Sequence, residues 1–182
     1  SAGPHARRPR RAAGAALGLP VKIVMPTNMS EERKVMMRRF GAEIIEVEPS
    51  DFHGAIQERN RLVDENENYW SSNQFENTLN IEVHETVTAP EINCDMLKLG
   101  FDSWHFVSGA GTGGTLMGIY EYMKNVAQGP GKVIQVAPAE TAKAHGIQGI
   151  NDGADFLLDR NKMSAQILVT TKDAIEASHE FA

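Results

Sequence analysis

The chain has 182 residues, of which 41% are hydrophobic and 23% charged, and its formal net charge at pH 7 is -6. This length is enough to bury a core in one domain or in two small ones. The negative charge gives no reason to expect nucleic acid or an anionic membrane as a partner, and no apolar run approaches the roughly 20 residues that span a bilayer. The single cysteine, Cys94, excludes an internal disulfide and fits a reducing compartment, so we expect a cytoplasmic protein.

The first part of the chain alternates apolar strands with amphipathic helices. The predicted strands span 21–26 and 42–47, and the predicted helices span 30–41 and 51–66. Ser30 is a suitable N-cap, and the spacing of Val35, Met36 and Phe40 indicates that these side chains face inward. Two strands joined by a helix predict a parallel crossover unit.

The alternation continues in the second part of the chain. Strands are predicted at 70–73, 104–107, 132–137 and 166–170, and helices near 79–81, at 113–126 and at 172–182. This order is typical of a doubly wound α/β fold, with 104–107 as a buried strand. Because the last predicted helix runs to the final residue without a cap, we expect the chain to be one piece of a longer protein.

A glycine-rich segment from Val107 to Thr115 follows one predicted strand and opens a helix. Such a turn presents backbone N–H groups at a helix N-terminus, which predicts a phosphate-binding loop. The segment also matches G-x-G-x-x-G, the weak dinucleotide pattern. A nicotinamide site needs an acid roughly 20 residues on, and Glu140 is a late candidate for that role. A tight turn that binds nothing is the third interpretation.

A cluster of amides, Asn73–Asn77, follows the predicted strand at 70–73. Side-chain amides there suit the carboxylate or amine of an amino-acid substrate. Composition alone favours a simpler interpretation, an Asx-rich turn that caps the next helix. The histidines show no paired spacing with Cys, Asp or Glu, so we expect no metal site.

Several segments together resemble the cysteine synthase (O-acetylserine sulfhydrylase) and cystathionine β-synthase family. The resemblance covers 18–182, and its segments are Val24–Pro26, Asn28–Arg33, Gly41–Glu43, Asn73–Asn77 with Asn80 and His84, then Thr88, Pro90, Glu91 and Ile92, and finally Gly111–Thr115 and Ile147–Ile150. These motifs occur in the family's order and at its separations. The resemblance implies a fold-type II architecture, like that of the tryptophan synthase β chain. Residues 1–77 would be part of the small domain and 78–182 part of the large domain.

The resemblance also implies a cofactor and a substrate. Pyridoxal 5'-phosphate (PLP) would be held at its phosphate by Gly111, Thr112, Gly113, Gly114 and Thr115. The amino-acid substrate, O-acetylserine or a similar activated serine, would contact Ser1, Gly3, Gln74 and Gly149. The implied reaction is β-replacement by a homodimeric enzyme, which yields cysteine or a related amino acid.

The chain departs from the family pattern at its N-terminal end. The family's Schiff-base lysine lies upstream of the substrate loop, whereas no lysine here precedes Lys22, which lies in a predicted non-catalytic strand. Pro4 stands where the resemblance expects an asparagine, and the arginines of 7–11 stand where it expects a buried helix. We therefore assign no catalytic residue within the chain, and a non-catalytic scaffold stays an alternative to an enzyme.

Overall fold

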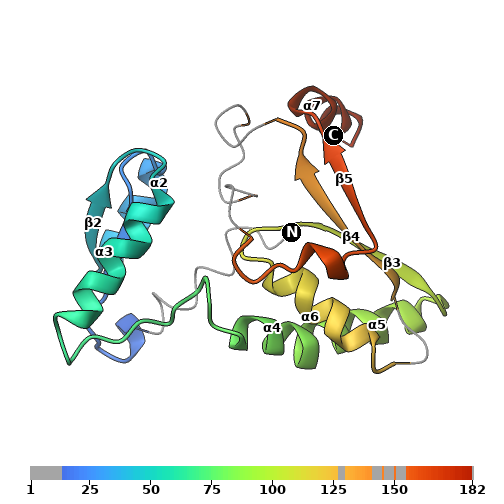
Figure 1. Ribbon diagram of the computed structural model, residues 1–182, viewed down its shortest axis with the longest axis horizontal. Coiled ribbons are helices and arrows are strands. Elements are labelled where there is room, and N and C mark those ends of the chain that lie inside the picture. The colour runs from blue at the N-terminus through green and yellow to red at the C-terminus, as the bar shows by residue number, and fades with distance from the viewer. Residues whose placement is uncertain (1–13, 127–129, 141–144, 146–149, 151–154, 182) are drawn as a thin grey trace. The chain divides into compact units, whose positions relative to one another are not determined.

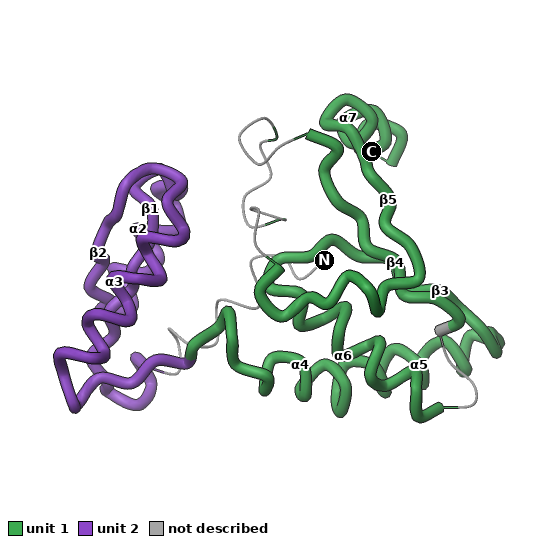
Figure 2. Tube along the Cα trace, in the orientation of Figure 1, with its two compact units in different colours: residues 1, 73–182 green, residues 2–72 purple. Residues whose placement is uncertain are grey.

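The computed structural model describes residues 14–126, 130–140, 145, 150 and 155–181. The chain divides into two compact units, one of Ala2–Ser72 and the other of Asn73–Ala182 together with Ser1 (Figure 2). Each unit has its own hydrophobic core. The assignment of 1–77 and 78–182 to a small and a large domain remains a prediction.

The first unit is built on the predicted parallel crossover. Its strands β1 (Lys22–Pro26) and β2 (Glu43–Val47) pair in parallel, with Val24 opposite Ile45. Helix α2 (Glu31–Arg39) connects them, and α3 (Phe52–Asp64) follows β2. The Asp51 carboxylate accepts a hydrogen bond from Gly54 N and caps α3.

The prediction for the buried face of α2 was wrong. Val35, Met36 and Phe40 are exposed, whereas Met37 is fully buried and Lys34 nearly so. Met37 packs in a core cluster with Met25, Met29 and Ala42. Lys34 is buried because its Nζ donates to the carbonyl oxygen of Thr27 at 2.6 Å and lies 2.5 Å from Oε1 of Glu46. The buried face of α2 thus includes a paired lysine, whereas hydrophobic periodicity selects the opposite face with its apolar residues.

The second unit is a parallel sheet with helices packed against it (Figure 1). Its strands are β3 (Trp104–Gly109), β4 (Pro130–Pro138) and β5 (Ala165–Val169), hydrogen-bonded in that order. Its helices are α4 (Leu79–Val83), a π-helix (His84–Thr88), α5 (Ala89–Lys98), α6 (Gly114–Met123), a 3₁₀ turn (Arg160–Lys162) and α7 (Thr171–Glu180). Helix α6 joins β3 to β4, packs on β4, and also contacts α4, the π-helix and α5. This places the N-terminus of α6 at the carboxyl end of β3.

Two local expectations for this half of the chain were wrong. No strand forms at 70–73, where Trp70 is 84% exposed and Asn73 adopts a left-handed conformation with φ 45°. In β3 only alternate side chains turn inward, so Trp104 is buried but Val107 is 53% exposed. In the described ranges, no helix is both long and apolar enough to cross a membrane.

Candidate phosphate-binding site

The glycine loop (Gly111–Thr115) runs from β3 into α6, as the sequence predicts. Gly113 is the N-cap of α6 and has φ 91°, a conformation that L side chains rarely adopt. A Cβ at Gly113 would also lie 2.6 Å from Cβ of Leu158. Both constraints require glycine where the first backbone N–H groups of α6 meet the loop. Those N–H groups and the positive end of the helix dipole favour an anion.

Two further glycines let a second helical segment approach α6 closely. A Cβ on Gly114 would lie 2.4 Å from Oδ1 of Asn80. One turn later, a Cβ on Gly118 would lie 2.5 Å from Cβ of His84 and 2.6 Å from the carbonyl oxygen of Ile81. The close approach occurs where α4 passes into the π-helix, an irregularity that is frequent at functional sites.

The close packing brings two polar side chains to the threonines of the glycine loop. Asn80 Nδ2 donates to Thr112 Oγ1 at 2.9 Å, and His84 Nε2 lies 3.2 Å from Thr115 Oγ1. The other ring nitrogen of His84, Nδ1, lies 3.0 Å from Thr88 Oγ1. Burial lowers the pKa of His84, so the imidazole is held in its neutral form, with one donor nitrogen and one acceptor.

The amide cluster at 73–77 forms a turn that leads into α4. Oδ1 of Asn77 accepts a hydrogen bond from Leu79 N at 3.0 Å, so the Asx-turn interpretation is confirmed for this residue. The ring centroids of Phe75 and Phe156 lie 4.4 Å apart, and Leu157 N donates to the carbonyl oxygen of Thr112 at 2.9 Å. Residues 156–157 therefore connect the turn that carries half-buried Gln74 to the glycine loop.

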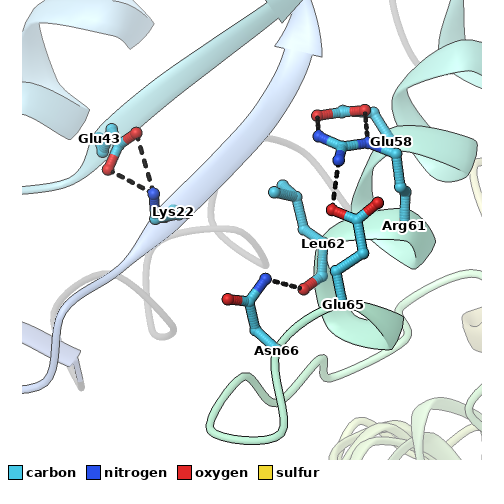
Figure 3. A network of polar contacts seen from close by, with 7 residues as sticks. All are labelled: Lys22, Glu43, Glu58, Arg61, Leu62, Glu65 and Asn66. Atoms are coloured by element: carbon cyan, nitrogen blue, oxygen red, sulfur yellow. Dashed lines mark hydrogen bonds and ion pairs between the residues drawn. The ribbon is translucent and has the colours of Figure 1, made fainter.

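Three of the predicted substrate contacts, Ser1, Gly3 and Gly149, lie outside the described residues. Lys22, the first lysine of the chain, forms an ion pair in which Nζ lies 2.9 Å from Oε2 of Glu43 (Figure 3). The hydrogen bond to Glu43 raises the pKa of Lys22, which keeps the amine protonated and unsuited to nucleophilic attack.

Glu140, the residue on which the nicotinamide hypothesis depends, serves α7 instead. Its Oε1 accepts a hydrogen bond from Thr171 N at 2.7 Å, and this bond lowers the pKa of the carboxyl group. The Glu140 carboxylate thus caps the start of α7, a structural role that involves no ribose. Within the ranges that the structure describes, no three His, Cys, Asp or Glu side chains gather as metal ligands.

The residues of the glycine loop fit the phosphate of PLP. Gly113 and Gly114 leave their backbone N–H groups without a side chain of their own, and Thr112 and Thr115 each carry a hydroxyl group. Such a set supplies donors without a fixed negative charge, which suits a phosphate dianion. Contacts of the threonines with Asn80 and His84 were not foreseen from the sequence; the only local signal is that Asn80, His84 and Thr88 recur every four residues, on one helical face.

Comparison with known proteins identifies the family of this chain. Residues 11–182 match the model of the pyridoxal-phosphate dependent enzyme family, and the chain belongs to that family. The cysteine synthase of Aquifex aeolicus is 36% identical over 176 residues, which cover 93% of this chain and 52% of that protein. Cysteine synthase A of Escherichia coli K12 is 33% identical over 192 residues, covering 90% and 55% respectively. The chain thus spans about half the length of the relatives that it matches.

Solved structures show the same fold. The crystal structure of cysteine synthase from Entamoeba histolytica superposes with a TM-score of 0.76 at 37% identity, covering 91% of this chain and 50% of that one. A hydrogen sulfide-producing enzyme of Fusobacterium nucleatum gives a TM-score of 0.80 at 35% identity, with coverage of 91% and 52%. The chain therefore has an incomplete α/β fold of the fold-type II PLP enzymes, as the sequence predicts.

Proposed function

We propose that the whole protein to which this chain belongs catalyses PLP-dependent β-replacement on an activated serine such as O-acetylserine, yielding cysteine or a related amino acid. The observation that carries the proposal is the glycine loop between β3 and α6, in a chain of the PLP-dependent family. The names of the relatives, cysteine synthases in Aquifex aeolicus and Escherichia coli, support the reaction class.

In this proposal the chain supplies the anchor of the cofactor and part of the substrate pocket. Gly111, Thr112, Gly113, Gly114 and Thr115 hold the phosphate of PLP through N–H and O–H donors. Bound PLP supplies an electron sink for the amino-acid substrate. Gln74 donates its side-chain amide to the substrate carboxylate. Roles for Ser1, Gly3 and Gly149 in binding the substrate follow from the family resemblance alone.

The chain as it stands would bind the phosphate end of PLP without holding the cofactor covalently. No lysine precedes Lys22 in the sequence, and Lys22 is engaged with Glu43. We therefore propose that the covalent attachment belongs to a part of the protein outside these residues. The alternative is a scaffold that retains the fold and binds a phosphate without catalysis.

A binding experiment tests the phosphate site directly. The chain is titrated with PLP and, in parallel, with pyridoxal, which lacks the phosphate, and binding is followed by absorbance. We expect saturable binding of PLP at least tenfold tighter than that of pyridoxal, because a charge-assisted hydrogen bond contributes about 1.5–3 kcal/mol. Gly113→Ala should abolish the difference. Equal affinity for the two compounds in the wild-type chain would refute the site.

Borohydride reduction separates the enzyme from the scaffold. After dialysis against excess PLP and reduction, peptide mapping should find no lysine of this chain stoichiometrically modified. A single modified lysine would identify a covalent residue within the chain and overturn our assignment. β-Replacement itself is tested in a chimera in which this chain replaces the matching part of Escherichia coli cysteine synthase A. We expect cysteine formation from O-acetylserine and sulfide; a folded chimera that retains PLP without turnover would favour the scaffold.

We further propose a homodimer in the cytoplasm. The single cysteine and the acidic composition support the compartment, and the dimer is carried over from the family resemblance. Light scattering of the purified protein measures the oligomeric state.

A further inference from the structure

The hydrogen-bond geometry around Thr112 determines where its hydroxyl proton points. Thr112 Oγ1 accepts from Asn80 Nδ2 at 2.9 Å, and Gly114 N lies 3.5 Å away as a second, longer donor. A hydroxyl has two acceptor lone pairs and one donor proton. Because both lone pairs face N–H groups, the hydroxyl proton of Thr112 is directed away from both of them.

The position of Asn80 is imposed by the packing of α4 on α6 (Figure 1). A Cβ on Gly114 would lie 2.4–2.9 Å from the terminal atoms of the Asn80 side chain, so this amide reaches the loop only because residue 114 is glycine. Asn80 is half-buried and lies 32 residues from Thr112 in sequence, so its contact is a product of the fold rather than of a local turn.

We infer that Asn80 is a positioning residue for the cofactor phosphate, which makes the Thr112 hydroxyl a fixed hydrogen-bond donor. The inference rests on the proposed function, in which the glycine loop holds the phosphate of PLP. Asn80 acts without touching the phosphate. Its amide N–H donates a hydrogen bond to the Thr112 hydroxyl oxygen, so the Thr112 hydroxyl proton is free to be donated to the anion. A donor whose direction is set in advance loses little freedom when the phosphate binds.

The substitution Asn80→Asp reverses this polarity. An ionised carboxylate only accepts hydrogen bonds, so the Thr112 hydroxyl would turn to donate to Asp rather than to the phosphate. We expect the affinity for PLP to fall about tenfold, the change associated with one hydrogen bond to a charged group, and the affinity for pyridoxal to stay unchanged. Thr112→Val, which removes the hydroxyl at nearly constant volume, should give a similar loss.

The double variant Asn80→Asp/Thr112→Val distinguishes positioning from simple charge repulsion. If Asn80 acts through Thr112, the double variant binds PLP no more weakly than Thr112→Val alone. A carboxylate that merely repels the phosphate would weaken binding again by the same factor in the Thr112→Val background, and that result overturns the inference. Should Asn80→Asp fail to fold, as judged by far-UV circular dichroism, Asn80→Ala enters the same cycle, with the same non-additivity expected.

The outcomes separate this inference from the proposed function. A wild-type chain that does not prefer PLP to pyridoxal refutes the phosphate site, and the inference with it. A wild-type chain that does prefer PLP, together with unaltered binding by Thr112→Val or with additive effects in the cycle, refutes only the role of Asn80. Competition by inorganic phosphate, measured for the same four proteins, should follow the same order of affinities.

Discussion

Gly118 and His84 face each other so closely that a Cβ on the glycine would lie 2.5 Å from Cβ of the histidine. The same Cβ would lie 2.8 Å from Glu85 N, so the obstacle includes backbone that cannot rotate away. This contact seats the π-helix against α6 and thereby brings His84 to Thr115. The glycine is therefore required by packing, although it lies in the interior of a helix.

We expect Gly118→Ala to destabilise the unit formed by Asn73–Ala182. Overpacking of this kind costs about 1–3 kcal/mol, whereas helix propensity alone would predict a gain of about 1 kcal/mol. The two effects have opposite signs, so the sign of the change in unfolding free energy shows which of them dominates. Urea denaturation followed by Trp104 fluorescence measures it, in a Trp70→Phe background that leaves one tryptophan. An unchanged or more stable protein would show that the two helices are not in this close contact.

The buried imidazole of His84 should make this unit sensitive to acid. Burial lowers the pKa of His84 below its ordinary value of 6.5, so the unfolded chain binds more protons than the folded chain as pH falls through 6.5. The contribution of His84 to the free energy of unfolding is therefore fully present above pH 6.5 and declines below it. We expect the urea concentration at the unfolding midpoint to be lower at pH 5.5 than at pH 7.5.

The variant His84→Gln isolates this contribution. The glutamine amide offers Thr115 both a donor and an acceptor but does not titrate, so the unfolding midpoint of this variant should depend less on pH than that of the wild type. His105→Gln, at an exposed position of β3, is the matched control. Identical slopes for the wild type and His84→Gln would exclude the imidazole as the source of the acid sensitivity.

Order and location of most elements follow from the sequence, because the strands at 21–26 and 42–47 and the helix after the glycine loop carry strong local signals. The loop itself is predictable because a glycine at 113 indicates a backbone conformation that other residues rarely adopt. The buried face of α2 was not predictable, since Lys34 is buried only through partners supplied by Thr27 and Glu46. Likewise the contact between Asn80 and Thr112 requires that residue 114 has no side chain. The sequence alone does not show this requirement, because it arises only where α4 and α6 pack against each other.

The burial of Lys34 predicts a specific loss of stability in the first unit. Lys34→Met retains the aliphatic stem but leaves the carbonyl oxygen of Thr27 without its 2.6 Å donor and Glu46 without its cation. We expect a destabilisation of about 1–3 kcal/mol. On the same helix, Arg38→Met removes an exposed ion pair with Glu31 at 3.2 Å and should have little effect. Equal losses for the two variants, measured by far-UV circular dichroism in guanidinium chloride, would contradict the prediction.

Glu140 should stabilise the start of α7 only when its carboxyl group is ionised. The hydrogen bond from Thr171 N lowers the pKa of Glu140 below 4.5, so the contribution is complete above this pH and is lost as pH falls through the folded-state pKa. Glu140→Gln keeps an acceptor oxygen but removes the charge. We expect a lower melting temperature than the wild type at pH 7 and a smaller difference near pH 4.

A second variant shows whether Glu140 acts through Thr171. Thr171 is the first residue of α7, and Thr170 before it is extended, with φ -75° and ψ 155°. Proline is tolerated at this helix position and after this backbone conformation, so Thr171→Pro keeps the helix, while its ring methylene replaces the N–H and displaces the Glu140 carboxylate. In the Thr171→Pro background, Glu140→Gln should no longer change the melting temperature. A persistent effect of Glu140→Gln would mean that the carboxylate stabilises the fold through another partner.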